Sequence, residues 1–221
     1  MARLLDRIEE APWRDSTALV VVADHGTALG QHDHMGHGLC WDEQLRVPLL
    51  IRVPGVAPQV IDALCSTLDL WPTLFGLVPE LADARFLEQC RGSDVLAADH
   101  VSRPLLATAA KQGIEALTAG HWKLLRSPRS APQLFDLEAD PSECQDVAAA
   151  HADVVAGMLK VLESEVAKQK KAAVLHRKSG APTGTPDPKL LEELRALGYT
   201  EDDPSGAGGA SGAGKTGGSG G

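Results

Sequence analysis

Long apolar runs are absent from this 221-residue sequence, and their absence sets the first limits. No stretch of about 18 apolar residues occurs, so an ordinary transmembrane helix is not expected. Residues 3–10 are amphipathic and charged where a secretory signal needs a continuous apolar run. We therefore expect no membrane span and no export signal in this chain, and its localisation stays open.

Paired cysteines are also absent. The four cysteines lie far apart and form no Cys-x-x-Cys pair, so neither a zinc ribbon nor a dense disulfide scaffold is indicated. We interpret all of them, Cys40, Cys65, Cys90 and Cys144, as buried free thiols.

Positive charge is scarce. Lys and Arg number 21 against 30 for Asp and Glu, which gives a formal net charge of −9. This excess of negative charge opposes polyanions, so no broad nucleic-acid surface is expected. With 43% hydrophobic and 23% charged residues, the composition is typical of a globular protein.

Two continuous apolar runs, residues 18–23 and 47–53, predict strands. Their density of Val, Leu and Ile favours strands buried on both faces, as in a parallel sheet. More than twenty residues, mostly polar and punctuated by glycine, separate the runs. Ligands of open parallel sheets bind beyond the carboxyl ends of the strands, so we expect the chemistry in this loop.

Periodicity and turn residues predict the remaining elements. Helices are expected over residues 2–11, 69–77 with Asp69 as the N-cap, 151–169 and 188–197. Four short strands, 105–109, 114–118, 122–125 and 133–137, predict a small antiparallel sheet. Trp71, Phe75 and Trp122 are expected in the core.

Residues 209–216, Gly-Ala-Ser-Gly-Ala-Gly-Lys-Thr, match the phosphate-binding loop pattern letter for letter. That loop needs a buried strand before it and a helix after it, because the helix N-terminus binds the phosphates. Gly- and Ser-rich sequence surrounds the match instead. We interpret it as a chance match and expect no nucleotide binding there.

Residues 23–38 concentrate groups that bind metals or transfer protons. These groups are Asp24, His25, His32, Asp33, His34 and His37. Asp24 and His25 follow a predicted strand, so they can offer a carboxylate oxygen and an imidazole nitrogen to one ion, while Gly26 lets the chain turn. Two ligands are too few for calcium or catalytic zinc, so the other ligands must come from elsewhere. A polar, solvated loop is the alternative interpretation.

Several different short motifs follow one another in a defined order along the chain. They are Asp24-His25-Gly26, Leu29-Gly30-Gln31-His32, Gly36-His37-Gly38, Arg46-Val47-Pro48-Leu49-Leu50-Ile51, Thr67-Leu68-Asp69-Leu70-Trp71-Pro72-Thr73-Leu74, Trp122-Lys123-Leu124-Leu125, Leu134–Glu143 and Leu194–Tyr199. This order resembles the C-terminal part of the type I sulfatases, which belong to the alkaline phosphatase-like superfamily. The resemblance covers about residues 3–200.

The resemblance implies a role for three of these residues. Asp24 and His25 would be ligands of a divalent cation, usually calcium in this family. His37 occupies the position of a Lys or His that contacts the sulfate ester, where it would stabilise or protonate the departing alcohol oxygen. His32 receives no role beyond orienting the loop, and Asp33 and His34 are expected to be solvated. The implied substrate is a small-molecule or glycan sulfate ester.

The resemblance also implies the fold class and its division. We expect an α/β chain with a partial sulfatase-like sheet and flanking helices. Residues 1–103 would be the C-terminal portion of the catalytic domain, and residues 104–200 a subdomain with the small antiparallel sheet and helices. Residues 201–221, which are rich in Gly, Ser and Ala, would be a disordered tail.

Two family features are missing from the sequence. No cysteine stands in the Cys/Ser-x-Pro-x-Arg motif that supplies the formylglycine nucleophile, and the paired Asp-Asp metal motif that family members carry near the N-terminus does not occur there. We therefore expect a C-terminal fragment of a sulfate ester hydrolase that is inactive alone and would need the N-terminal half of the catalytic domain. A related phosphoesterase or phosphonate hydrolase and a non-catalytic metal-binding module stay open as alternatives.

Overall fold

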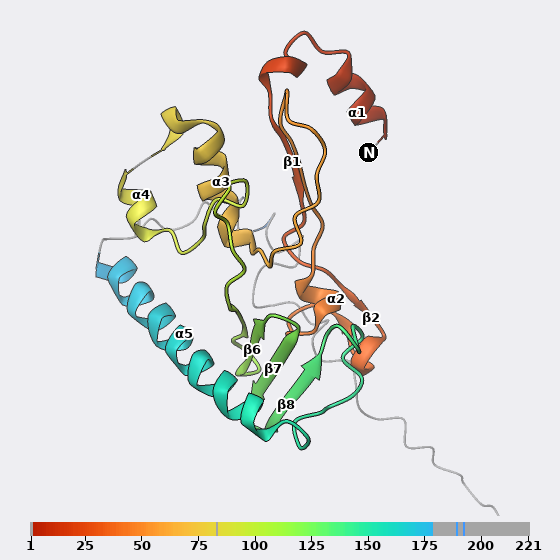
Figure 1. Ribbon diagram of the computed structural model, residues 1–221, viewed down its shortest axis with the longest axis vertical. Helices are drawn as coiled ribbons and strands as arrows, with labels where there is room; N and C mark the ends of the chain where they lie inside the picture. Colours follow the sequence, from red (N-terminus) through yellow and green to blue (C-terminus); the bar gives the residue numbers. More distant parts are fainter. Residues whose placement is uncertain (1, 83, 179–188, 190–191, 193–221) are drawn as a thin grey trace, which may run out of the picture. The chain divides into compact units, whose positions relative to one another are not determined.

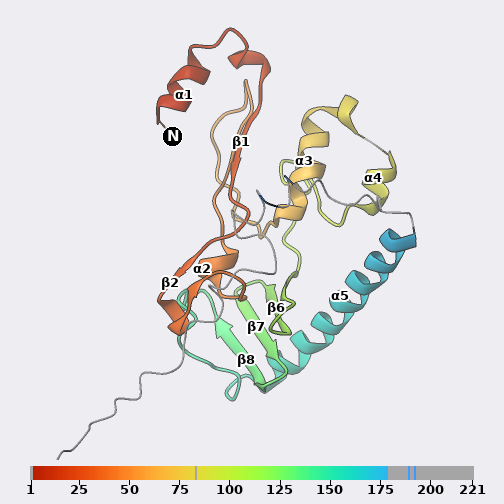
Figure 2. The ribbon, with the colours of Figure 1, turned by 180° about the vertical axis from the view of Figure 1, so that it is seen from behind.

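Figures 1 and 2 show the computed structural model from opposite sides; it describes residues 2–82, 84–178, 189 and 192. The chain divides into two compact units, Met1–Ala173 and Val174–Gly221. Of the predicted helix 188–197, only Lys189 and Glu192 are described, and both are helical. The predicted tail and the phosphate-loop match lie outside the described residues, and the predicted boundary between residues 103 and 104 stays a prediction.

The elements over residues 2–89 lie in the first unit. In chain order they are α1 (Ala2–Glu9), η1 (Arg14–Ser16), β1 (Leu19–Val22), β2 (Ala28–Leu29), η2 (Gln31–Asp33), β3 (Met35–Gly36), α2 (Asp42–Leu45), β4 (Leu49–Arg52), η3 (Thr67–Asp69), α3 (Leu70–Leu77), η4 (Pro79–Leu81) and α4 (Ala84–Gln89). None of the described helices is both long and apolar enough to cross a membrane.

The two predicted inner strands form an antiparallel pair. β1 pairs with β4 so that Leu19 faces Arg52 and Val22 faces Leu49. The expected parallel, doubly buried arrangement is wrong for the described residues, because β1 pairs only with β4 and neither strand contains a buried residue. An apolar run can be buried on both faces only where other layers cover it, and both described core clusters lie elsewhere.

The predicted small antiparallel sheet is confirmed. Its strands are β5 (Leu105–Ala109), β6 (Ile114–Ala119), β7 (Trp122–Ser127) and β8 (Ser130–Asp136), in the order β5-β6-β7-β8. Gly120 adopts a φ of 59° in the tight turn between β6 and β7, a conformation that favours glycine. The mixed α/β class predicted from the sequence is therefore correct.

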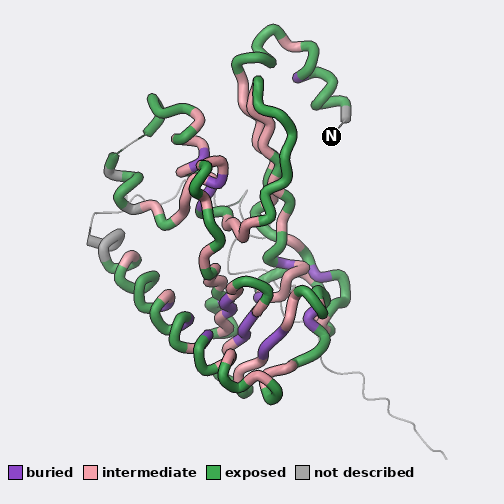
Figure 3. Tube along the Cα trace, in the orientation of Figure 1, coloured by how far each residue is buried: buried purple, intermediate pink, exposed green. Residues whose placement is uncertain are grey.

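The two faces of this four-stranded sheet build the described core. On one face, α5 (Ala152–Lys178) packs its apolar side chains against the strands. This cluster consists of Leu117, Leu124, Leu134, Met158, Leu162 and Val166. The other face carries Ala109, Ala116, Leu125 and Phe135 together with Cys40. Figure 3 shows buried positions on the sheet and on α5, and none on the β1–β4 pair.

Asp69 has a different role from the one predicted. Its side chain makes no capping hydrogen bond to α3; Ser66 and Asp69 instead form a capping box around η3. The buried Asp69 carboxylate also accepts the Ser93 N–H at 2.7 Å and binds Arg103 at 2.6 Å. It therefore fastens the segment before α3 to residues 93–103.

Two expectations about burial need correction. Trp71 is 53% exposed and contacts Phe75 and Phe86 at the surface, because no described layer covers that side of α3; Phe75 and Trp122 are half-buried. All four cysteines are free, as predicted. Only Cys40 is buried, whereas Cys144 is exposed.

Candidate functional site

Asp24 and His25 lie just beyond the end of β1. The Asp24 carboxylate accepts the His25 N–H at 2.9 Å. His25 Nδ1 lies 2.8 Å from the carbonyl oxygen of Gly26, which can only accept, so Nδ1 carries a proton. That Nε2 lies 3.8 Å from a carboxylate oxygen of Asp24. A carboxylate oxygen and an imidazole nitrogen therefore face each other, an arrangement that suits a cation between them when Nε2 is unprotonated.

Gly26 fixes the place of this pair against α2. Its N–H donates to the carbonyl oxygen of Gln44 at 2.8 Å. A Cβ at residue 26 would collide with the carbonyl oxygen of Glu43. The chain can approach α2 this closely only because residue 26 has no side chain.

The structure brings His37 to the same place. The His37 and His25 rings lie 4.4 Å apart, centroid to centroid, at an interplanar angle of 49°. Gly36 and Gly38 flank His37 and both have positive φ values, 99° and 103°. All three residues singled out by the sequence therefore meet, and they lie at the surface. Their roles stay predictions.

The fit to a metal ion is partial. Among the residues that the structure describes, no group of three or more His, Cys, Asp or Glu could hold a metal ion. Asp24 and His25 provide one oxygen donor and one nitrogen donor, and the hydrogen bond from Nδ1 to a backbone carbonyl is typical of metal-binding histidines. Calcium takes six to eight oxygen ligands, so these two residues alone would not complete such a shell.

His32 occupies a junction that the sequence did not predict. Its Nδ1 lies 3.1 Å from Glu43 Oε1, and its Nε2 lies 3.1 Å from the backbone oxygen of Glu143. Its ring stacks on Trp41 with centroids 3.8 Å apart and planes 2° apart. His34 and Asp33 do not share these contacts: Asp33 is exposed, as expected, and His34 is half-buried.

A buried ion-pair cluster adjoins His32. Lys123 on β7 is fully buried, and its Nζ lies 2.7 Å from Asp42 and 2.6 Å from Glu143. Burial raises the pKa of the Glu143 carboxyl, and the Lys123 ammonium acts in the opposite direction. A lysine within an apolar strand is the sequence signal that could have revealed this cluster.

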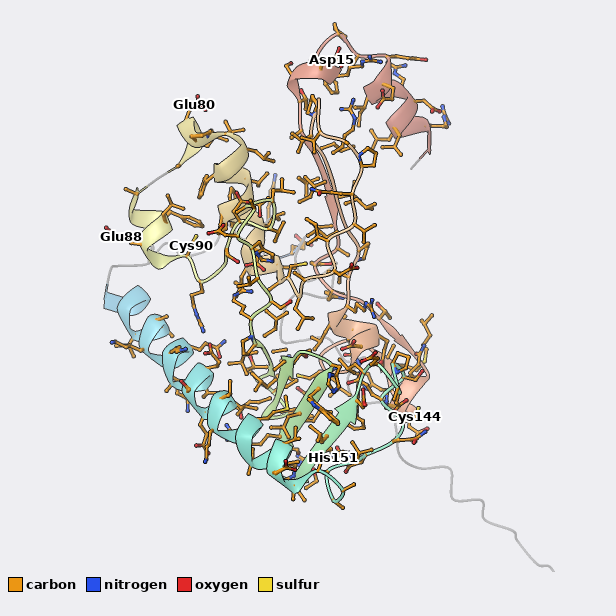
Figure 4. The ribbon with its side chains drawn as sticks, viewed as in Figure 1. Asp15, Glu80, Glu88, Cys90, Cys144 and His151 are labelled. Carbon is orange, nitrogen blue, oxygen red and sulfur yellow. The ribbon has the colours of Figure 1, made fainter. Side chains whose placement is uncertain are left out.

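A hollow of about 590 Å³ lies beside His32, between the η2 turn and the loop that follows β8. Its lining residues are Gly30, Gln31, His32, Asp33, Trp41, Gln133, Phe135, Ser142, Glu143, Cys144 and Asp146. Figure 4 labels Cys144 on the loop after β8. Asp24, His25 and His37 do not line this hollow, so it is separate from the Asp24–His25 pair.

Sequence comparisons relate the chain to known enzymes. Residues 1–80 match the protein-family model described as Sulfatase. The choline-sulfatase of Rhizobium meliloti is 30% identical over 156 residues, which cover 67% of this chain and 30% of that protein. The chain spans about a third of the length of the first curated relatives that it matches.

Solved structures share the fold. The structure of a 2-O GAG sulfatase has a TM-score of 0.62 at 20% identity and covers 84% of this chain and 42% of that one. The phosphonate monoester hydrolase of Agrobacterium radiobacter has a TM-score of 0.62 at 22% identity and covers 76% and 38%. The described part of the chain therefore has the architecture of one portion of these larger enzymes.

Proposed function

Because the chain is of the sulfatase type, we propose that Asp24, His25 and His37 form one part of a site that hydrolyses a sulfate ester. The observation that carries this proposal is the meeting of these residues beyond β1. The donor atoms of Asp24 and His25 lie 3.8 Å apart, and the His37 ring lies beside His25.

Asp24 and His25 would hold a divalent cation, for which calcium is our proposal. When bound, such a cation supplies positive charge that polarises the sulfuryl oxygens. Gly26 keeps the pair close to α2, and the Gly26 carbonyl keeps the proton of His25 on Nδ1. With Nε2 unprotonated, its lone pair would be available to the cation.

His37 would act on the leaving group. An imidazole beside the ester can donate a hydrogen bond or a proton to the departing alcohol oxygen, and such catalysis is worth about 10²- to 10⁴-fold in rate. The nucleophile must come from residues other than these. We therefore propose that the 221 residues alone do not hydrolyse sulfate esters.

The catalytic proposal can be tested by grafting. Residues 24–38 of this chain replace the aligned loop of the Rhizobium meliloti choline-sulfatase, and kcat/KM is measured with that enzyme's own sulfate ester. Asp24→Asn and His37→Ala in the graft should each lower kcat/KM by at least about 100-fold. Asp33→Asn is the matched control and should leave it unchanged. Grafts in which Asp24→Asn and His37→Ala retain full activity would contradict the proposal.

The metal proposal has a separate test, calorimetric titration of the 221-residue chain with calcium. With two donor residues we expect a dissociation constant for calcium above about 10⁻³ M. In Asp24→Asn we expect no calcium binding. Binding that survives this substitution would contradict the assignment. Tight binding by the isolated chain would instead favour a self-sufficient metal-binding module.

A phosphonate or phosphate ester hydrolase is the second candidate function. The chain shares the fold of the phosphonate monoester hydrolase of Agrobacterium radiobacter at 22% identity, a likeness that shows the fold and leaves this alternative open. The same graft, assayed with a phosphonate monoester and a sulfate ester, separates the two. A change in preference toward the phosphonate by orders of magnitude would favour this candidate.

A further inference from the structure

His32 makes two contacts that no neutral imidazole can satisfy together. Nδ1 faces the Glu43 carboxylate and Nε2 faces the Glu143 carbonyl oxygen, each at 3.1 Å. A carboxylate and a backbone carbonyl only accept hydrogen bonds, and a neutral imidazole has one N–H. Both hydrogen bonds form only when the ring carries a proton on each nitrogen.

The backbone supports this junction independently. Among the described residues, the non-glycine positions with positive φ are His32 at 51°, Asp33 at 52° and Glu143 at 54°. Two of them are the residues that the Nε2 contact joins, and the third adjoins His32. Non-glycine residues keep this conformation only where their surroundings hold them in it.

The charges around the ring favour an imidazolium. His32 and Glu43 are mostly shielded from solvent, with side chains 15% and 16% exposed. The Glu143 carboxylate is held by Lys123 and by the Asp42 N–H, so only its carbonyl oxygen faces His32. Other titratable groups around the hollow beside the ring are Asp33, Cys144 and Asp146. The charged group that faces His32 directly is thus the Glu43 carboxylate, which attracts a positive ring.

We propose that His32 is a positioning residue which, as an imidazolium, fastens the loop of Asp24, His25 and His37 to the four-stranded sheet. Glu43 connects the ring to α2, against which Gly26 is held, and Glu143 connects it to the loop after β8. His32 lies in the turn between β2 and β3, and β3 ends at Gly36, directly before His37. The positioning role rests on the proposed function, whereas the charged junction does not.

Nuclear magnetic resonance of the 221-residue chain with ¹⁵N-labelled histidine tests the charge directly. At a pH of about 7.5 a histidine in water is mostly neutral. The ring nitrogens of His32, assigned by the signal lost in His32→Gln, should both show the shifts of protonated nitrogens. Exposed His121 supplies a reference signal in the same spectrum. A neutral tautomer at His32 would overturn the proposal.

Glu43→Gln tests the cause while keeping the side-chain shape. The His32 signals should then change from the imidazolium to the neutral pattern, and the His25 and His37 signals should shift with them. His121→Gln, on the turn between β6 and β7, should leave all of these signals in place. Unchanged His32 signals in Glu43→Gln would overturn the coupling. If the graft is inactive while His32 is charged in the 221-residue chain, only the proposed function is refuted. If the graft is active while His32 is neutral in the 221-residue chain, only this inference is refuted.

Discussion

At the scale of single residues, the candidate site depends on positions without side chains as much as on its histidines. Gly26 leaves room for α2, and Gly36 and Gly38 permit the positive φ values around His37. The imidazoles are exposed and have few contacts of their own. Their mutual arrangement is therefore a property of the backbone.

Gly26→Ala should test this dependence. The added Cβ meets the carbonyl oxygen of Glu43, so the loop or α2 must move, which should lower the free energy of unfolding by about 1–3 kcal/mol. Urea denaturation measures the effect. Gly157→Ala on α5 is the matched control, because nothing lies within 4 Å of a Cβ added at residue 157. This change should raise the free energy of unfolding by about 1 kcal/mol. Equal effects of the two changes would refute the close-approach argument.

Lys123→Met should be among the most damaging single changes. It leaves the Glu143 and Asp42 carboxylates without their shared cation, which typically costs about 3–5 kcal/mol. Burial and the Asp42 carboxylate then raise the pKa of Glu143 further above the unfolded value, opposed only by the hydrogen bond from the Asp42 N–H. Stability should be fullest below the unfolded pKa and should fall as the pH rises through the folded one.

Urea denaturation of Lys123→Met at several pH values measures both the loss and its pH dependence. Lys160→Met, at an exposed position on α5, is the control and should change stability by less than about 0.5 kcal/mol. A Lys123→Met chain that is as stable near neutral pH as at acidic pH would contradict the role given to burial.

At the scale of elements, the four-stranded sheet and α5 form the best-packed part of the described chain. Strand alternation divides its side chains between the α5 face and the Cys40 face. The sheet also supplies Lys123, and the loop that follows it supplies Glu143. Packing of this element therefore supports the junction around His32.

Two adjacent residues on α5 allow the effect of burial to be measured within the same helix. Leu162 is fully buried and Val161 is 38% exposed. Leu162→Ala should lower the free energy of unfolding by about 2–5 kcal/mol, because it removes apolar contacts and leaves a cavity. Val161→Ala should cost less than about 1 kcal/mol. Thermal or urea unfolding measures both, and similar losses would contradict the assigned packing.

At the scale of the whole molecule, burial is unevenly distributed. The four-stranded sheet lies between two apolar clusters, whereas the β1–β4 pair is half-exposed on both faces and ends at the candidate site. A two-stranded ribbon without a covering layer is marginally stable in water. The proposed ligands Asp24 and His25 thus follow a strand with little described support.

Hydrogen exchange should resolve this difference. Amides of β1 and β4 should exchange faster than those of β6 and β7 by orders of magnitude, since they open without disrupting an apolar cluster. Mass spectrometry of peptides from the intact chain measures both regions in one sample, with β6 and β7 as the internal standard. Equal protection would contradict the marginal stability of the ribbon.

The sequence by itself determined the elements that follow local rules. Alternation and turn glycines located β5 to β8, helical spacing located α5, and the ordered motifs identified the sulfatase type, which the comparisons confirm. The pairing and cover of β1 and β4 were beyond its reach, since an apolar run specifies neither its partner nor the layer above it. The antiparallel β1–β4 pair and exposed Trp71 are the results.

Only the tertiary structure decided which polar groups meet across long separations. His32 reaches Glu143 over 111 positions in the chain, and Lys123 reaches Asp42 over 81. Such contacts depend on how sheet and loop pack, whereas Asp24 and His25 are neighbours in any fold. The sequence could therefore identify the pair that would bind a cation, but the groups that hold its loop in place became visible only when distant segments were brought together.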